Sequence, residues 1–199
     1  MEFTFWGVRG SIPAPGREFN RYGGNTACVA IRAADGQLFI LDAGMGFTVL
    51  GQKLMATEFG KGEGSAALLL THTHWDHIQG FPFFVPFFIP GNAFCIYGTG
   101  GSPEVLEGIL DGQFNPHFSP LHSLGNLPAT MDFNVVQEST PTQIQSLTVT
   151  ACSAEHGRRT ALAYRIEEGD QVVVYAPDTA YPDGAASPEL AQRFAGADY

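Results

Sequence analysis

Apolar and polar residues alternate over short stretches along the whole chain, and this period of two predicts β-strands that are covered on one face. Two of the stretches flank Asp35-Gly36, a dipeptide that favours a tight hairpin turn. Residues 66–71 form a continuous apolar run instead, which is typical of a strand covered on both faces. The predicted strands cover residues 26–33, 37–42, 66–71, 94–97, 144–151, 161–167 and 171–176.

Helices are predicted between these strands. Apolar residues recur at helical spacing over residues 46–59. Two more helices should start at residues 102–104 and 187–189, where a serine N-cap is followed by proline and glutamate. Strands outnumber helices, and we find no internal repeat and no linker. We therefore expect an α+β fold and a single domain over residues 1–199.

Two segments lack a regular pattern. Residues 113–130 carry several prolines and the histidines His117 and His122, which indicates a long ordered loop or lid. Residues 81–90, FPFFVPFFIP, are apolar, but their three prolines exclude a regular helix. This second segment contributes either to the core or a subunit contact, or to a hydrophobic wall beside a functional site.

The chain is acidic. It contains 20 Asp and Glu residues against 10 Lys and Arg residues, for a formal net charge of −10. This charge repels nucleic-acid backbones at long range, so we expect no long nucleic acid as a partner, and any small anionic substrate would be attracted only by local charge. Such a substrate needs local positive charge, which Arg9, Arg17 and Arg21 could supply unless they only support a surface loop.

Cysteine usage and hydropathy bear on the location of the protein. Cys28, Cys95 and Cys152 are widely spaced and form no CxxC pair, which disfavours a disulfide framework. No apolar run approaches the length of a membrane-spanning helix, and the N-terminal residues do not resemble a secretion signal. We therefore expect a soluble cytoplasmic protein that does not bind membranes.

The densest group of potential metal ligands follows the strand predicted at residues 66–71. There, in LLLTHTHWDHIQG, His72, His74, Asp76 and His77 include half of the six histidines in the chain. A loop leaving a buried strand can point alternate side chains the same way, which allows two adjacent cation sites. Nitrogen and oxygen ligands with open positions are typical of catalytic zinc, iron or manganese. The alternative is ordinary histidines held by hydrogen bonds.

A family resemblance strengthens the metal hypothesis. The stretch HTHWDH matches the HxHxDH signature of the metallo-β-lactamase superfamily. Similarity to the branch of ribonuclease Z-like and cyclic-nucleotide phosphodiesterase-like hydrolases extends to FWGVRGSIPAPG, RYGGNTACV, LDAGMG and GFPFFVPFFIPGN. The resemblance implies a four-layer αββα sandwich with two divalent metal ions at one edge. Zinc, manganese and iron are all candidates for these ions.

The resemblance also implies a set of ligands for the first metal. It assigns this role to His72, His74 and a later histidine, for which His156 is in a suitable place. It further implies that Asp178, in YAPDTAYPDG, bridges both metals. Taken alone, Asp178 would be read as a turn residue next to Pro177.

For the second metal the resemblance implies Asp76 and His77 as ligands. Asp42 would orient one of the ligands through a hydrogen bond. An alternative role for Asp42 is to cap the helix that follows it. The family has one more histidine beyond the bridging aspartate, whereas no histidine follows His156 here. The second metal is therefore one ligand short.

Three explanations for this missing ligand are open. We prefer a sequence that lacks the C-terminal segment of the fold, which would also leave an exposed sheet edge. Alternatively, the nitrogen comes from His117, from His122 or from a neighbouring subunit in a homodimer. In the third explanation, the second metal site is weak or empty.

The sequence departs from the family around His156 as well. The family usually has a proline and glycines there, whereas this chain has EHGRRTA. Arg158 and Arg159 are thereby expected near the metals. They either bind a phosphate through bidentate contacts or are solvated charges at the start of a strand.

Together these features predict a metal-dependent hydrolase that acts through a metal-bound hydroxide, with Asp76 and Asp178 holding and orienting the nucleophile. We expect a phosphodiesterase for a small nucleotide or cyclic nucleotide. One alternative keeps the site and changes the substrate to a carboxylic ester, thioester or lactone. Another is a non-catalytic metal-bound module for sensing or interaction.

Overall fold

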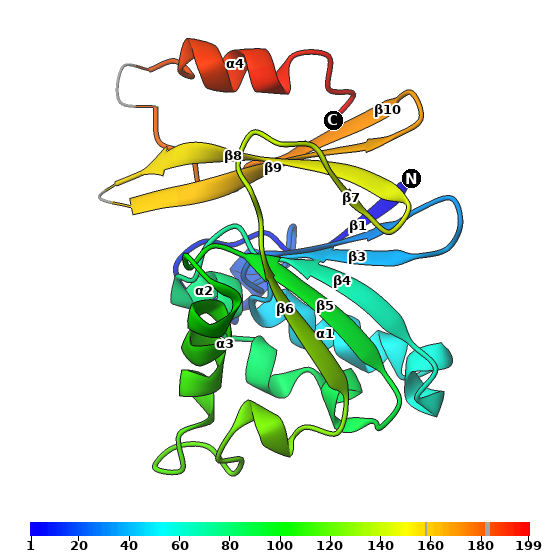
Figure 1. Cartoon of the computed structure of the whole chain (residues 1–199). Helices are drawn as coiled ribbons and strands as arrows, with labels where there is room; N and C mark the ends of the chain where they lie inside the picture. Colours follow the sequence, from blue (N-terminus) through cyan, green and yellow to red (C-terminus); the bar gives the residue numbers. More distant parts are fainter. Residues whose placement is uncertain (158, 182–183) are drawn as a thin grey trace.

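The computed structural model describes residues 1–157, 159–181 and 184–199 of the chain. Two β-sheets lie face to face, and helices cover their outer faces (Figure 1). The predicted four-layer αββα sandwich is therefore confirmed. The metal-ligand candidates lie where loops from both sheets meet at one edge of this sandwich.

The first sheet has six strands in chain order, and its two halves differ in direction. The first three strands pair antiparallel, and the hairpin predicted at Asp35-Gly36 joins the second to the third. From the third strand onward the pairing is parallel, so connections must cross over the sheet. The strands are β1 (Glu2–Gly7), β2 (Cys28–Arg32), β3 (Leu38–Leu41), β4 (Ser65–Leu69), β5 (Ala93–Gly98) and β6 (Thr130–Val135).

The second sheet is antiparallel throughout, in the order β10-β9-β8-β7. Its strands are β7 (Thr142–Ile144), β8 (Leu147–His156), β9 (Arg159–Glu168) and β10 (Gln171–Tyr175). Strand β10 is at the edge, but it is not bare, because the amide of Val174 donates to Tyr199 and the amide of Asp198 donates to Val172, both at 2.8 Å. The expected exposed edge is thus partly paired.

Within the described residues, the α-helices that flank the sheets are α1 (Met45–Leu54), α2 (Trp75–Ile78), α3 (Pro103–Asp111) and α4 (Pro188–Phe194). The first three lie below the first sheet in Figure 1, and α4 lies above the second. The two serine N-caps are confirmed, since the hydroxyl oxygens of Ser102 and Ser187 accept hydrogen bonds from backbone amides three residues on. None of the helices in the described part of the chain combines the length and apolarity needed to cross a bilayer.

Strand β3 shows how alternation divides the core in two. Leu38 and Ile40 face the helices below the first sheet, whereas Phe39 and Leu41 face the second sheet. All four side chains are buried. Successive residues of a strand point to opposite faces, so one strand with apolar residues throughout supplies both layers.

Residues 81–90 fold into two short 3-10 helices, Phe81–Phe83 and Val85–Phe88. Their aromatic side chains separate into two sets. Phe81, Phe84 and Phe87 are buried, and the ring of Phe84 stacks on Phe47 with centroids 3.7 Å apart. Phe83 and Phe88 remain exposed. The expected role in the core is therefore confirmed, and the same segment also exposes apolar side chains.

Several elements differ from the sequence prediction. The predicted helix over residues 46–59 ends at Leu54, and Glu58–Lys61 forms a separate 3-10 helix. Strands β1, β6 and β7 were not predicted. Residues 113–130 are irregular, as expected, apart from the end of one 3-10 helix, Gly112–Phe114, and all of another, Leu124–Asn126.

Candidate metal centre

The loop that follows β4 carries most of the candidate ligands. It leaves the buried carboxyl end of β4 and is tied to the second sheet on the way. The hydroxyl of Tyr164 donates to the carbonyl of Leu70 at 2.7 Å, and the amide of Leu162 donates to the carbonyl of Thr71 at 2.8 Å. These bonds fix the loop where the two sheets meet.

Helix α2 continues this loop, and backbone hydrogen bonds with the turn after β3 hold it in place. The amide of Ala43 donates to the backbone carbonyl of His77 at 2.7 Å, and the amide of Gly80 donates to the backbone carbonyl of Ala43 at 2.8 Å. A Cβ atom on Gly44 would lie 2.2 Å from the carbonyl oxygen of Asp76. The glycine of LDAG is therefore needed because backbone approaches backbone here.

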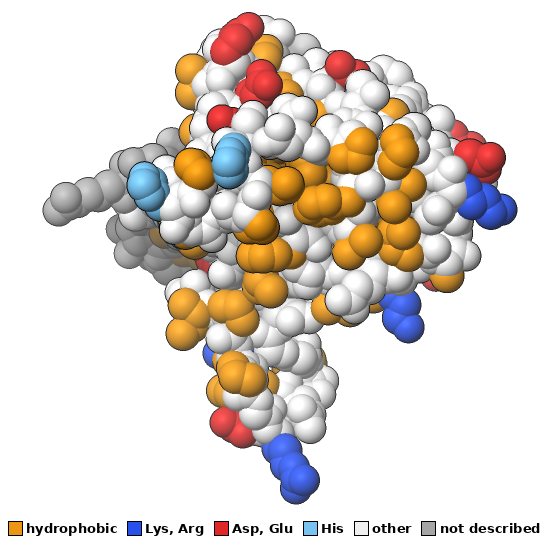
Figure 2. Space-filling model, turned by 90° about the horizontal axis from the view of Figure 1, so that it is seen from below, with side chains coloured by type: hydrophobic (Ala, Val, Ile, Leu, Met, Phe, Trp, Pro, Cys, Tyr) orange, Lys and Arg blue, Asp and Glu red, His pale blue; other side chains and the backbone are white. Residues whose placement is uncertain are grey.

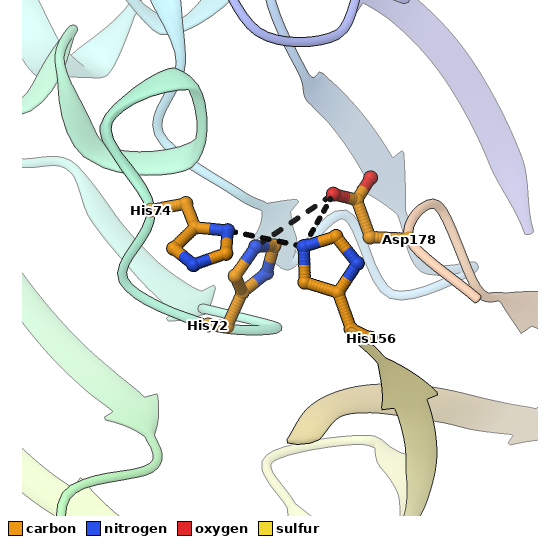
Figure 3. A group of neighbouring side chains, drawn as sticks. All are labelled: His72, His74, His156 and Asp178. Carbon is orange, nitrogen blue, oxygen red and sulfur yellow. Dashed lines mark hydrogen bonds and ion pairs between the residues drawn. The ribbon is translucent and has the colours of Figure 1, made fainter. Parts of the chain in front are cut away.

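The first cluster consists of His72, His74, His156 and Asp178 (Figure 3). The histidines at 72 and 74 come from the loop after β4, His156 ends β8, and Asp178 follows β10. Their side chains point toward one another, and one potential ligand atom from each lies within 4.8 Å of all the others. Nε2 of His156 is 3.0 Å from Nδ1 of His74.

The second cluster consists of Asp76, His77 and Asp178. Nε2 of His77 lies 3.6 Å from Oδ2 of Asp76 and 3.4 Å from Oδ1 of Asp178. Asp76 and His77 are both buried, and both come from α2. In the part of the chain that the structure describes, neither His117 nor His122 belongs to this or any other such group.

Asp178 joins the two clusters. Its Oδ2 lies 3.3 Å from Nε2 of His156 and 3.7 Å from Nε2 of His72, while its Oδ1 faces His77 in the second cluster. One carboxylate thus turns one oxygen toward each group. This is the arrangement that a residue bridging two cations would have.

The buried histidines have free nitrogens aimed into the clusters. Nε2 of His72 and Nε2 of His77 are buried and have no hydrogen-bond partner among the described residues. Nδ1 of His72 lies 3.1 Å from the hydroxyl of Thr71, and Nδ1 of His77 lies 2.8 Å from Oδ2 of Asp42. A carboxylate only accepts hydrogen bonds, so Nδ1 of His77 carries a hydrogen, and Nε2 is the nitrogen that faces the second cluster.

These observations fit divalent metal ions. Buried polar atoms are nearly always paired, so two unpaired nitrogens side by side require an explanation. A cation bound in each cluster would supply the missing partner. The donor set of imidazole nitrogens and carboxylate oxygens suits zinc, manganese or iron.

Asp42 supports His77 and is completely buried. Its carboxylate accepts hydrogen bonds from the amide of Thr71 at 2.8 Å and from the hydroxyl of Tyr175 at 3.0 Å. The alternative role as a helix cap is wrong, because Gly44 is the N-cap of α1. The contact with His77 has the form of the carboxylate–histidine pairs that orient metal ligands.

The two buried histidines have opposite pKa shifts. Burial, reinforced by the nearby charge of His77, lowers the pKa of His72 to about 4. Burial also disfavours the charged form of His77, but the hydrogen bond and charge of Asp42, with the charges of Asp178 and Asp76, raise its pKa to about 8. Negative charge therefore accumulates around the second cluster, where it attracts cations.

The remaining candidates are arginines. Arg158 lies outside the described residues, as does the side chain of Arg159, whose backbone pairs with His156 at the start of β9. Arg9 is half-buried and stacks its guanidinium on the ring of Phe19, 4.4 Å from the centroid. It lines a cavity of about 310 Å³ together with His77 and Asp178.

Three contacts of the site were missed from the sequence. The amide of Ser11 donates to Oδ2 of Asp76 at 2.6 Å, from a residue with a φ of 67°. Thr71 and Tyr175 hold Asp42, as described above. The stretch containing Ser11 was singled out only as part of the resemblance, and nothing in the local pattern marks Thr71 or Tyr175.

Comparison with known proteins agrees with this geometry. A family model described as Beta-lactamase superfamily domain matches residues 38–199. The comparison with curated protein sequences gave no match.

Two solved structures share the fold. One is described as the metallo-β-lactamase fold protein YhfI from Bacillus subtilis, with 21% identity and a TM-score of 0.61 over 92% of this chain and 64% of that one. The other is described as a diphosphatase from the PhnP family, with 18% identity and a TM-score of 0.55 over 85% of this chain and 63% of that one. This chain therefore spans less than two thirds of either protein.

Proposed function

This chain belongs to the beta-lactamase superfamily, and from that premise we propose that it is a metal-dependent hydrolase of phosphodiesters in small or cyclic nucleotides. The observation that carries the proposal is the position of Asp178. Its two oxygens are divided between two groups of ligands, and an unpaired buried histidine nitrogen lies in each group. Such a pair of adjacent sites suits hydrolysis assisted by two cations.

Each proposed ligand has a defined task. The first cation would be held by the first cluster and the second cation by the second, with Asp178 common to both. Bound divalent cations would make water a nucleophile near neutral pH and stabilise negative charge that develops on the substrate. Asp76 and Asp178 would orient that water. The histidines would act as neutral donors and not as general bases.

The position of Arg9 favours an anionic substrate. The chain as a whole is acidic, with a formal net charge of −10, so a phosphodiester is attracted only by local positive charge. Arg9 provides such charge in the cavity that also contains His77 and Asp178. One structure of the same fold is described as a diphosphatase, so the proposed chemistry has a parallel in another protein of this fold.

The proposal includes the setting in which the protein works. We propose zinc, manganese or iron as the metal and a single domain over residues 1–199 acting in the cytoplasm. The substrate is small and anionic. Cys28, Cys95 and Cys152 are free, which is compatible with a reducing compartment.

The test asks whether the protein hydrolyses phosphodiesters or carboxylic esters, using p-nitrophenyl substrates that release the same leaving group. We expect bis(p-nitrophenyl) phosphate, and then cyclic nucleotides, to be hydrolysed when zinc or manganese is added. His74→Ala should reduce the rate by roughly 100-fold or more, since even residues behind the ligands give effects of about 10- to 100-fold. His117→Ala is the matched control and should leave the rate unchanged, because the exposed His117 lies outside both clusters. Turnover of p-nitrophenyl acetate without turnover of the phosphodiester would reject the proposal in favour of an esterase.

A further inference from the structure

An apolar pocket of about 450 Å³ lies beside the metal-binding loop. Three segments that are separate in the sequence form its walls: helix α2, the 3-10 helices of residues 81–88, and the irregular segment at residues 112–121. Its main apolar lining residues are Trp75, Phe83, Phe88, Phe114, Phe118 and Leu121. Small-molecule sites have this size and character, in the range of about 300–1,000 Å³.

Helix α2 connects this pocket to the metal centre. Asp76 and His77 turn inward to the second cluster, whereas Trp75 and Gln79, which are four residues apart, line the pocket. Trp75 stands directly between the candidate ligands His74 and Asp76 in the sequence, with its Cα about 3.8 Å from each of theirs. His74 and Trp75 are both exposed, so the start of α2 is open to a ligand that reaches both sides.

The pocket exposes aromatic surface to an unusual extent. Trp75 is 74% exposed, Phe118 69% and Phe83 63%. The face of the molecule seen from below carries many hydrophobic side chains, with charged side chains mostly at its margins (Figure 2). Large aromatic groups that are grouped in a hollow and left in water mark binding sites.

One polar group in the wall also lacks a partner. Nε2 of Gln113 is buried and makes no hydrogen bond within the described residues. Gln113 lines the pocket together with Gln79 and Ser119. A few polar groups in an otherwise apolar hollow are typical of sites that orient a small ligand.

We propose that this pocket holds an apolar arm of the substrate, a ring or alkyl chain carried by the group that is esterified to the phosphate at the metals; in a nucleotide this arm is the base. The inference rests on the proposed function for the position of the phosphate. It adds that the enzyme prefers phosphodiesters with one bulky apolar group. The occupant is part of a small molecule and not a protein, because the site is a hollow of small-molecule size and Trp75 in its wall adjoins the candidate ligands His74 and Asp76 in the sequence.

The first experiment varies the arm and keeps the reaction constant. In hexyl p-nitrophenyl phosphate, water adds at phosphorus, the bond to p-nitrophenolate breaks, and hexyl phosphate remains. We expect its KM to be about 10- to 100-fold below that of methyl p-nitrophenyl phosphate, since each buried methylene contributes roughly 0.8 kcal/mol at most. Equal KM values for the two esters would overturn the inference.

Variants locate this preference in the pocket. Phe118→Ala should raise KM for the hexyl ester by roughly 5-fold and leave KM for the methyl ester unchanged, because it removes one apolar wall. Phe118 is exposed, so the substitution should not affect folding. The matched control is Tyr22→Ala, an equally exposed aromatic residue (71%) outside the pocket. A change in Tyr22→Ala equal to that in Phe118→Ala would contradict the inference.

A second readout does not depend on turnover. The chain has only two tryptophans, and Trp6 does not line this pocket. Hexylphosphonate should cover Trp75 and shift its fluorescence to shorter wavelength, whereas methylphosphonate should not. The shift should weaken in Phe118→Ala. Identical spectra with both phosphonates would overturn the inference.

The two proposals can fail separately. If no phosphodiester is cleaved but p-nitrophenyl hexanoate is preferred over the acetate, the proposed function fails and the pocket assignment stands. If phosphodiesters are cleaved without any preference for chain length, only the pocket assignment fails. A dimer in sedimentation that dissociates in Phe118→Ala, with no effect on KM, would assign the pocket to a second copy of the chain and overturn the inference.

Discussion

The two ligand clusters are built differently, although they share Asp178. The first has three imidazoles and draws on both sheets, and His74 within it is exposed. The second has only Asp76 and His77 besides the shared aspartate, but both are buried and Asp42 braces His77 from behind. The first cluster thus has more ligands, whereas the ligands of the second are better supported. We infer that the first holds its cation by many donors and the second by rigid ones.

The largest effect should come from the residue common to both clusters. Asp178→Ala removes the oxygens that face each group, so we expect both metal ions and essentially all turnover to be lost. Elemental analysis of the purified variant gives the number of ions per chain, and circular dichroism verifies that it is folded. Retention of two tightly bound ions would end the view that Asp178 bridges the clusters.

Removing a ligand that belongs to only one cluster should affect the metal ion of that cluster and spare the other. We expect His156→Ala and His77→Ala to retain about one ion per chain each. In the metal-free state, His77→Ala should be less stable by roughly 1–3 kcal/mol, because the buried carboxylate of Asp42 loses a hydrogen-bond partner. His156 is half-buried, and among the described residues no carboxylate behind it plays the part of Asp42, so its replacement should cost less. Urea unfolding measures both values, and equal losses would argue against the difference in support.

A smaller effect is expected from Asp42→Asn. This change keeps the shape of the side chain but removes the charge opposite His77. We expect metal affinity at the second cluster to fall by about 10- to 100-fold, and affinity at the first cluster to change much less. A competitive titration with a chelating dye resolves the two affinities. An equal fall at both clusters would show that Asp42 supports the whole centre.

The smallest predicted effect concerns Tyr175→Phe, which removes one of the hydrogen bonds to Asp42. A hydrogen bond to a charged group contributes about 1.5–3 kcal/mol, and the remaining bonds to Asp42 should compensate in part. We expect the second ion to bind only a few-fold more weakly in the same titration. Tyr181→Phe is the control, since Tyr181 is half exposed and its hydroxyl makes no hydrogen bond within the described residues.

Sequence reasoning captured the strands that are buried along almost their whole length, β2, β3 and β4, together with four others. It missed β1 and β6, which lie at the two edges of the first sheet, and β7, which lies at an edge of the second. Phe5 in β1 is 62% exposed, and Asp132 in β6 alternates with apolar residues that are only partly covered. At an edge the environment on each face is mixed, so the periodic signal is weak. The central strands have no such ambiguity.

The candidate ligands were predicted in two ways, from local spacing and from the family resemblance. Spacing alone grouped the residues of HTHWDH, because they are neighbours in the sequence. His156 and Asp178 came from the resemblance, since only folding brings them to the same place. The contacts that support the ligands were harder to predict from the sequence. Asp42 bonds to Tyr175 across the interface of the two sheets, and no local pattern encodes that distance.

The first cluster also has a consequence for the order of folding. Its ligands come from the loop after β4 and from the ends of β8 and β10, so they meet only when the two layers have docked. Bringing such distant segments together is slow, because the entropy of loop closure is lost before the stabilising contacts form. We therefore expect metal ions to bind only after the two sheets have packed together, so that the number of ions bound per chain reports the fraction of molecules that have finished folding.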